Sequence, residues 1–245
     1  MSSNTFYYDL PAETKIWRYM DFAKLVSLFE HSSLYFPRSD CFEDQYEGTF
    51  PQTNIQVIHD LEASVDTRGA LEWYNFVDWL RTWTYISCWH VNNKESYAMW
   101  KLYARTNEAI AVQSTVGRLR KTMPDNAFIG VVRYMDYDTE IIQRSDRFSP
   151  FLHKRSSFEH EKELRVLFQN SPPGGFHATE TRTEGPLGIP VPVNLDELID
   201  TIYVAPLADA WFSDLVTKIA HRYGLKCKVR PSGLDAPPAR YPLRA

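Results

Sequence analysis

The chain has 245 residues, of which 44% are hydrophobic and 24% are charged, and it carries 7 Trp, 14 Tyr and 14 Phe. This composition is typical of a globular protein with a substantial core and argues against a disordered chain. A formal net charge of -4 and a pI near 6.0 argue against generic binding to a nucleic-acid backbone, which depends on neutralising phosphates.

The N-terminal half begins with a predicted strand over 15–21, followed by an amphipathic helix that Asp21 can cap. A second short strand is predicted over 33–39. An acid-rich stretch at 41–52 comes next, and we expect a solvated surface loop in which Asp44 and Glu47 face water. The further predicted elements of this half are helices over 54–65 and 69–84, a buried strand over 85–91, and a helix that Asn92 and Glu95 open as a capping box.

The C-terminal half contains predicted strands at its beginning and end and a long loop in the middle. The loop at 170–188 is rich in Pro, Gly, Ser and Thr. The other predicted elements are strands over 108–114, 128–138, 189–194, 201–206 and 225–232, a short basic helix over 115–123, and a helix over 207–224 that Gly224 ends. This mixture predicts an α+β fold with a mainly antiparallel, split sheet and flanking helices. We expect an N-terminal extension over 1–15, one globular domain over 16–234 and a flexible tail over 235–245.

The stretch "SSFEHEKELRVLF" at 156–168 carries charged side chains at every second position. They are Glu159, Glu161, Glu163 and Arg165. Because the stretch runs without a break into an apolar segment, we expect it to be extended, with all four side chains on one face. The alternative is a helical turn, in which the pair Glu159 and Glu163 would repel while Glu161 and Arg165 would attract.

Several common functional motifs are absent from the sequence. There is no GxGxxG, GxxxxGK[ST] or GxSxG, which disfavours the common nucleotide-binding folds and the α/β-hydrolases. The 7 histidines show no HExxH spacing, and the cysteines Cys41, Cys88 and Cys227 form no CxxC pair. We therefore expect no metal site, a reducing cytoplasm and, because no apolar run approaches about 18 residues, no membrane span.

Three blocks of sequence together resemble the bacterial domain of unknown function family 2971 (DUF2971). They are "IWRYMD" with "LFEHSSLYFPRSDCFEDQYEG", "YISCWHVNNKESYAMWKLYA" and "FLHKRSSFEHEKELRVLF". A C-terminal "IYVAP" followed by a helix also fits, so the resemblance covers about residues 16–234. The chain departs from the family pattern at Glu43 and Gln45, where Asn and Pro are expected, and at Phe158, where Trp is common. The family implies no established activity.

The order of Arg18, Ser87 and a Glu-x-Glu is similar to that of NAD-consuming ADP-ribosyltransferases. The resemblance implies that Arg18 and Ser87 hold NAD, and that Glu163 or Glu161 is the catalytic carboxylate that stabilises positive charge on the ribose. Arg165 would keep the acid ionised. The remaining residues of the predicted NAD site are Tyr19, Trp89 and Trp100.

Each of these residues also has a simple structural interpretation. Arg18 could be an ion-pair partner of Asp44 or Glu47, Ser87 a small buried residue, and the two tryptophans part of the core or of a cleft wall. We expect a NAD-dependent ADP-ribosyltransferase-like enzyme, a toxin or phage-defence effector that modifies a nucleic acid or a protein. The alternatives are a non-catalytic binding module and a metal-dependent nuclease that uses Asp44, Glu47 and the Glu-x-Glu acids.

Overall fold

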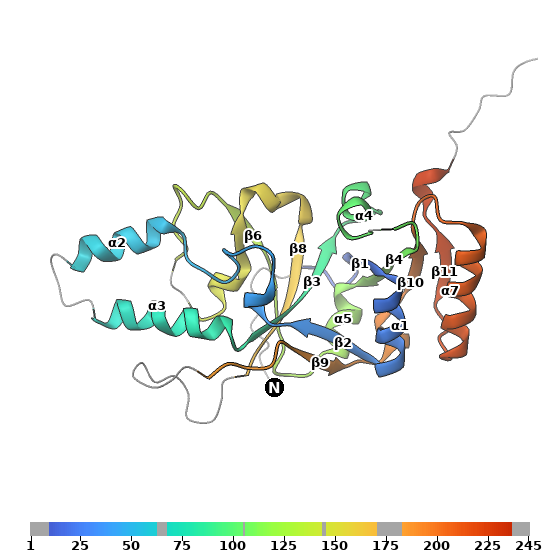
Figure 1. Cartoon of the computed structure of the whole chain (residues 1–245), viewed down its shortest axis with the longest axis horizontal. Coiled ribbons are helices and arrows are strands. Elements are labelled where there is room, and N and C mark those ends of the chain that lie inside the picture. Colours follow the sequence, from blue (N-terminus) through green and yellow to red (C-terminus); the bar gives the residue numbers. More distant parts are fainter. Residues whose placement is uncertain (1–9, 63–67, 105, 144–145, 171–182, 237–245) are drawn as a thin grey trace, which may run out of the picture. The chain divides into compact units, whose positions relative to one another are not determined.

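The computed structural model describes residues 10–62, 68–104, 106–143, 146–170 and 183–236 (Figure 1). The chain divides into two compact units. Unit 1 is built mainly from Ser33–Val91 and Met123–Val193, and unit 2 from Pro11–Ser32, Asn92–Thr122 and Asn194–Ala245. Each unit therefore joins segments that are far apart in the sequence. The single domain expected over 16–234 stays a prediction, and most of the loop expected at 170–188 lies outside the described residues.

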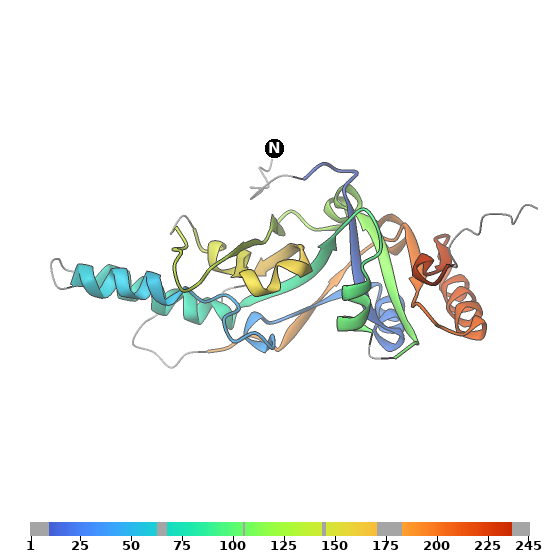
Figure 2. The ribbon, with the colours of Figure 1, turned by 90° about the horizontal axis from the view of Figure 1, so that it is seen from above.

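Unit 1 is centred on antiparallel strands, with β8 (Glu163–Gln169) between β3 (Thr84–Val91) and β5 (Phe128–Val131). Nearly every residue of β3 and β8 is buried, which agrees with their aromatic and β-branched sequences. Helices α2 (Gln52–Glu62) and α3 (Arg68–Arg81) lie side by side (Figures 1 and 2). The remaining strands of the unit form two pairs, β2 (Ser33–Pro37) with β9 (Gly188–Pro192), and β6 (Arg133–Met135) with β7 (His153–Arg155).

The core of unit 1 packs between α3 and the central strands. Leu80 of α3, Ile86 of β3, Leu167 of β8 and Phe151 are all fully buried in one cluster. Burying side chains of this size contributes about 1.5–3 kcal/mol each. The cluster therefore holds β8 in place on the face that Leu167 shares with Arg165.

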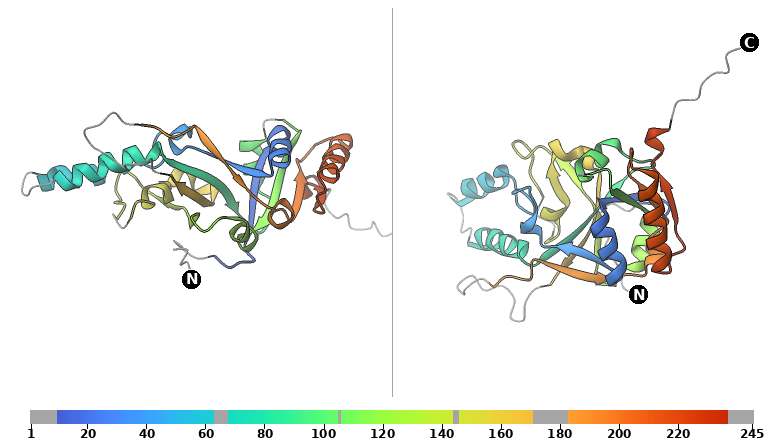
Figure 3. Two further views of the ribbon diagram at one scale, coloured as in Figure 1. Left: turned by 90° about the horizontal axis from the view of Figure 1, so that it is seen from below. Right: turned by 45° about the vertical axis from the view of Figure 1, so that its right-hand side comes forward.

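Unit 2 contains four strands in the order β11-β10-β4-β1. Strand β4 (Ala109–Thr115) is antiparallel to both β1 (Lys15–Asp21) and β10 (Thr201–Val204), while β11 (Lys228–Pro231) is parallel to β10. Helix α7 (Ala210–Arg222) packs on β10 and β11 (Figure 3). The other helices of the unit are α1 (Phe22–His31), α4 (Tyr97–Tyr103), α5 (Val116–Thr122) and α6 (Leu195–Leu198).

The structure confirms the predicted α+β class with a mainly antiparallel sheet and flanking helices. Asp21 caps α1 by accepting a bond from the Lys24 backbone N–H at 2.8 Å, as predicted. The capping box at Asn92 and Glu95 is wrong, because α4 begins later and the Ser96 side chain caps it. The strand expected over 128–138 is also wrong as one element, since it breaks into β5 and β6.

Across the part of the chain that the structure describes, no helix has both the length and the apolar character needed to cross a membrane.

Candidate functional site

The charged stretch before β8 is not extended over its whole length, which corrects the prediction from the sequence. Residues Ser156–Glu161 form a 3₁₀ helix, Lys162 ends it in the left-handed region at φ 43°, and β8 begins at Glu163. Glu159 is exposed on the 3₁₀ helix, whereas Glu161 is buried. Only Glu163 and Arg165 therefore share a strand face as predicted.

Five charged side chains of unit 1 form what we call the buried charge chain, in the order Glu47, Arg165, Glu163, Lys154, Glu161. The Arg165 terminal nitrogens bind both Glu47 carboxylate oxygens, at 2.5 and 2.9 Å, and its Nε binds Glu163 at 2.5 Å. Lys154 Nζ lies 3.4 Å from Glu163 and also donates to Glu161. All five residues are between 0 and 7% exposed. Positive and negative groups thus alternate along a continuous internal path.

The side chains of two acids in the acidic loop, Asp44 and Glu47, are buried, so the expectation that they face water is wrong, although other residues of the loop are exposed. Glu47 contacts Arg165, as above, and Asp44 accepts a bond from Arg155 at 2.8 Å. The Asp44 side chain is only 6% exposed. Each of these acids is bound by an arginine of unit 1, and the suggestion that they pair with Arg18 stays a prediction.

The charges of this chain determine which carboxylate holds a proton. With all three glutamates ionised, the five groups carry one net negative charge, which is costly in a buried setting. Glu163 lies between two cations, Arg165 and Lys154, which hold its pKa well below the ordinary value in spite of its burial. Glu161 has Lys154 alone, and burial together with the neighbouring Glu163 carboxylate raises its pKa to about 7. Burial raises the pKa of Glu47 as well, but the Arg165 guanidinium binds both of its oxygens and favours its ionised form, so we place the proton of the chain on Glu161.

The register of β3 and β8 places the predicted residues of β3 on the opposite face from the charge chain. Residues paired directly across an antiparallel ladder share a face. Ser87 is paired with Val166, and Trp89 with Leu164, whereas Cys88 is the residue opposite Arg165. Since β-strand side chains alternate, Ser87 and Trp89 point away from the face of Arg165 and Glu163. Both are buried in unit 1.

The predicted residues of unit 2 are divided in a similar way. Tyr19 and Trp100 contact each other edge to face, with ring centroids 4.9 Å apart, in a buried cluster that includes Trp17. The Tyr19 hydroxyl accepts a bond from the Ser96 backbone N–H at 2.9 Å. Arg18 is half-buried on the other face of β1, because it alternates with Trp17 and Tyr19.

Two members of the charge chain were not predicted as residues of the NAD site: Lys154, and Glu47, which was named only for the alternative nuclease. The one signal for Glu47 is its place in "FEDQYEG", within the first block of the family resemblance. Lys154 lies in the third block, two residues before the stretch with alternating charges at 156–168. Neither residue shows a local pattern that predicts a buried partner.

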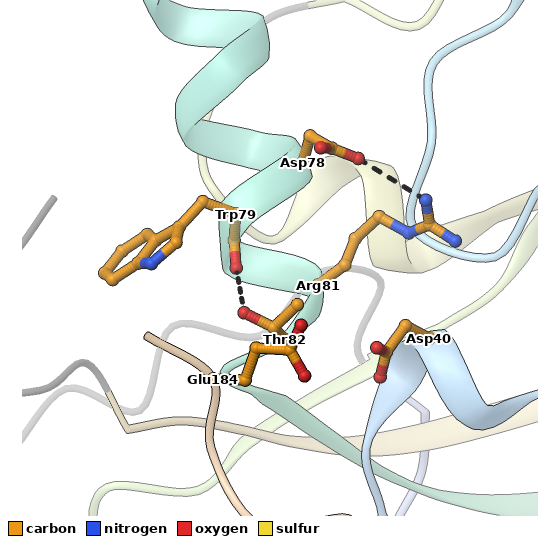
Figure 4. A pocket seen from close by; sticks show the side chains of 6 residues that line it. All are labelled: Asp40, Asp78, Trp79, Arg81, Thr82 and Glu184. Carbon is orange, nitrogen blue, oxygen red and sulfur yellow. Dashed lines mark hydrogen bonds and ion pairs between the residues drawn. The ribbon is translucent and has the colours of Figure 1, made fainter. Parts of the chain in front are cut away.

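A pocket of about 270 Å³ lies elsewhere in unit 1 (Figure 4). Its lining residues are Asp40, Asp78, Trp79, Arg81, Thr82 and Glu184. Buried Arg38 holds two of these acids, with its nitrogens 2.6 Å and 2.9 Å from Asp40 and 3.1 Å from Glu184. No residue of the predicted NAD site lines this pocket. Among the residues that the structure describes, no group of three or more His, Cys, Asp or Glu side chains is placed to hold a metal ion.

Comparison with known proteins adds a loose structural likeness. No model of a known protein family matches the chain, and no curated protein matches it. DarT of Thermus sp. 2.9 in complex with NAD+ matches with 11% identity and a TM-score of 0.42, over 91% of this chain and 97% of that one. The same protein in complex with ADP-ribosylated ssDNA matches over 93% and 97%, again with 11% identity and a TM-score of 0.42. At these values the likeness establishes neither a common fold nor a common activity, and the resemblance to DUF2971 stays a prediction.

Proposed function

We propose that this protein is a NAD-consuming ADP-ribosyltransferase in which Glu161 is the carboxylate at the reaction centre. The observation that carries the proposal is the pair Glu161 and Glu163, whose pKa values are displaced in opposite directions by their surroundings. Two neighbouring carboxylates with separated pKa values are typical of sites that combine a proton acceptor with a permanent charge. A group that titrates near pH 7 is well matched to accept a proton in neutral solution.

The proposed reaction uses each carboxylate for a different purpose. The bond between the ribose and nicotinamide breaks, and its electron pair leaves with the nicotinamide ring. Positive charge then develops on the ribose, and a negative carboxylate stabilises it more than it stabilises the ground state. A hydroxyl or amine of the acceptor bonds to the ribose carbon, and Glu161 takes up its proton. Glu163 stays ionised and sets the field in which Glu161 works.

Placement within the units narrows the set of residues proposed to act in this site. The clamp function of Arg18 stays a prediction from the sequence, made because an arginine fork can bind two oxygens of a pyrophosphate. Ser87 and Trp89 leave the set, since the register turns them away from Glu163. Tyr19 and Trp100 have the contacts of core residues in unit 2, and Arg165 supports the carboxylates through its ion pairs.

The test is the release of nicotinamide from NAD+ by the purified protein, because that step does not depend on whether the acceptor is a nucleic acid or a protein. Glu161→Gln is expected to lower the rate by about 100-fold or more. The wild-type rate should rise with pH through about 7, the value to which burial raises the pKa of Glu161. Glutamine resembles the protonated carboxyl group that the folded protein already holds at low pH, so this variant should keep its fold.

Glu159→Gln is the matched control, since Glu159 is an exposed glutamate two positions earlier on the same 3₁₀ helix. Its rate should equal that of the wild type. Equal rates for the Glu161→Gln variant and the wild type would remove the mechanism. Tight binding of NAD+ that is recovered unchanged would instead support a non-catalytic binding module, which the deep burial of the charge chain also fits.

A further inference from the structure

We infer that Glu47 is a positioning residue for Glu161, acting along the buried charge chain through Arg165 and Glu163. The inference rests on the proposed function for the role of Glu161, but the charge coupling can be tested without any activity. It brings into the site the acidic loop, a segment that is 118 positions from Arg165 in the sequence.

The contacts of Arg165 show how Glu47 can act at a distance. A guanidinium group has a rigid planar fork, so a carboxylate that binds both terminal nitrogens fixes its orientation. Glu47 binds these two nitrogens, and this leaves Nε directed at Glu163. With Glu47 neutralised, the whole charge of Arg165 would act on Glu163 and the groups beyond it.

The charge count gives the sign of the effect on Glu161. The five groups are neutral when one carboxylate is protonated and carry one negative charge when none is. Removing the charge of Glu47 makes the chain neutral with Glu161 ionised, so Glu161 should lose its proton at a lower pH. Removing the charge of Lys154 makes the chain more negative, so Glu161 should keep its proton to a higher pH. The two substitutions therefore act in opposite directions.

The other groups around Glu161 and Glu47 do not reverse this sign. The Tyr134 hydroxyl accepts a bond from the Glu163 backbone N–H, and Tyr137 lies close to Glu47; burial raises the pKa of both phenols. His90 Nδ1 is 2.6 Å from the Glu161 carbonyl oxygen, and burial lowers the pKa of this imidazole, which disfavours its charged form. The neighbouring His160 and Lys162 are exposed.

The experiment follows the carboxyl carbon of Glu161 by NMR in the full chain labelled with ¹³C at glutamate, between pH 4 and pH 9. The resonance is assigned by its absence in the Glu161→Gln variant. Glu47→Gln is expected to lower the titration midpoint by about one unit or more, and Lys154→Met to raise it by about one unit or more. Asp44→Asn is the matched control, because it removes a buried acid of the same loop that binds Arg155 and not Arg165. Its midpoint should stay near that of the wild type.

A second variant covers the case in which Glu47→Gln does not fold. Glu47→Asp keeps the charge but shortens the side chain, so it cannot hold the Arg165 fork, and its midpoint should fall by about half a unit. A midpoint that is unchanged in the folded Glu47 variants, or shifted equally by Asp44→Asn, would overturn the inference. If midpoints shift as expected while no variant or wild type releases nicotinamide, the coupling stands and the proposed function falls. If Glu161→Gln abolishes nicotinamide release but the midpoints of the Glu47 variants do not move, the proposed function stands and the coupling falls.

Discussion

At the scale of single residues, Arg165 is the group on which the charge chain depends. Its side chain has no exposed surface, and its Nη1 also donates to the Phe151 carbonyl at 2.7 Å. Taking a guanidinium group out of water costs several kcal/mol, which only well-placed acceptors offset. Arg165 has them in Glu47, Glu163 and a backbone carbonyl. Without Arg165, the carboxylates of Glu47 and Glu163 would stay buried and lose the arginine that binds them.

Arg165→Met is therefore expected to lower the free energy of unfolding by about 3–5 kcal/mol. Arg165→Lys keeps the charge but loses the fork, so its loss should be smaller. Urea unfolding at pH 7 measures both. The control is Arg133→Met, because Arg133 and its partner Glu140 are 51% and 42% exposed, and such a pair contributes at most about 1 kcal/mol. Similar losses at the two arginines would contradict the stabilising role of the buried chain.

At the scale of elements, the junction before β8 shows what the alternating charges could predict. The pattern placed Glu163 and Arg165 on one face correctly, because "LRVLF" is an apolar run that specifies a strand. Before Lys162 no such run exists, and long-range contacts decide the structure instead. The Glu161 side chain accepts a bond from Lys154, and the Glu161 carbonyl oxygen accepts one from His90 Nδ1; the 3₁₀ turn provides both contacts.

The burial of Glu47 in the acidic loop could not be predicted for a related reason. "FEDQYEG" has the composition of a solvated turn, and nothing local shows that Glu47 will meet a buried arginine. Arg165 requires a carboxylate partner only once β8 is covered by its neighbours and the guanidinium group has lost its contact with water. The sequence therefore predicted the α+β class, and it predicted Glu161 and Glu163 as candidate site residues. It could not predict which acids are buried in contact with the same cations.

The loop also depends on Gly48, the residue after Glu47. Gly48 has φ +69°, and a Cβ at this position would overlap the Phe151 ring. Gly48→Ala should lower the thermal midpoint more than Gly224→Ala, where φ is +77° and nothing lies within 4 Å of the added Cβ. The second change costs only the left-handed backbone, about 1–2 kcal/mol. Equal midpoints in thermal unfolding monitored by circular dichroism would show that the close approach to Phe151 is not needed.

At the scale of the whole molecule, the two carboxylates make stability depend on pH in opposite ways. The folded pKa of Glu161 is raised from 4.5 to about 7, so its contribution is fully present below pH 4.5 and is lost as the pH rises through 7. The folded pKa of Glu163 is lowered, so its contribution is present above pH 4.5 and is lost as the pH falls through the depressed value. Together they are most stabilising near pH 4.5.

The difference in unfolding free energy between the wild type and Glu161→Gln isolates the first of these effects. Other titrating groups, such as His90 and His153, whose pKa values burial lowers, are present in both proteins and cancel to first order. Between pH 4.5 and pH 8 the difference should fall by on the order of 3 kcal/mol, in the sense that the wild type loses stability relative to the variant. Urea unfolding at intervals of half a pH unit measures it, with Glu159→Gln as the exposed control whose difference from the wild type should stay flat. A flat or rising difference for Glu161→Gln would mean that Glu161 does not hold the proton of the charge chain.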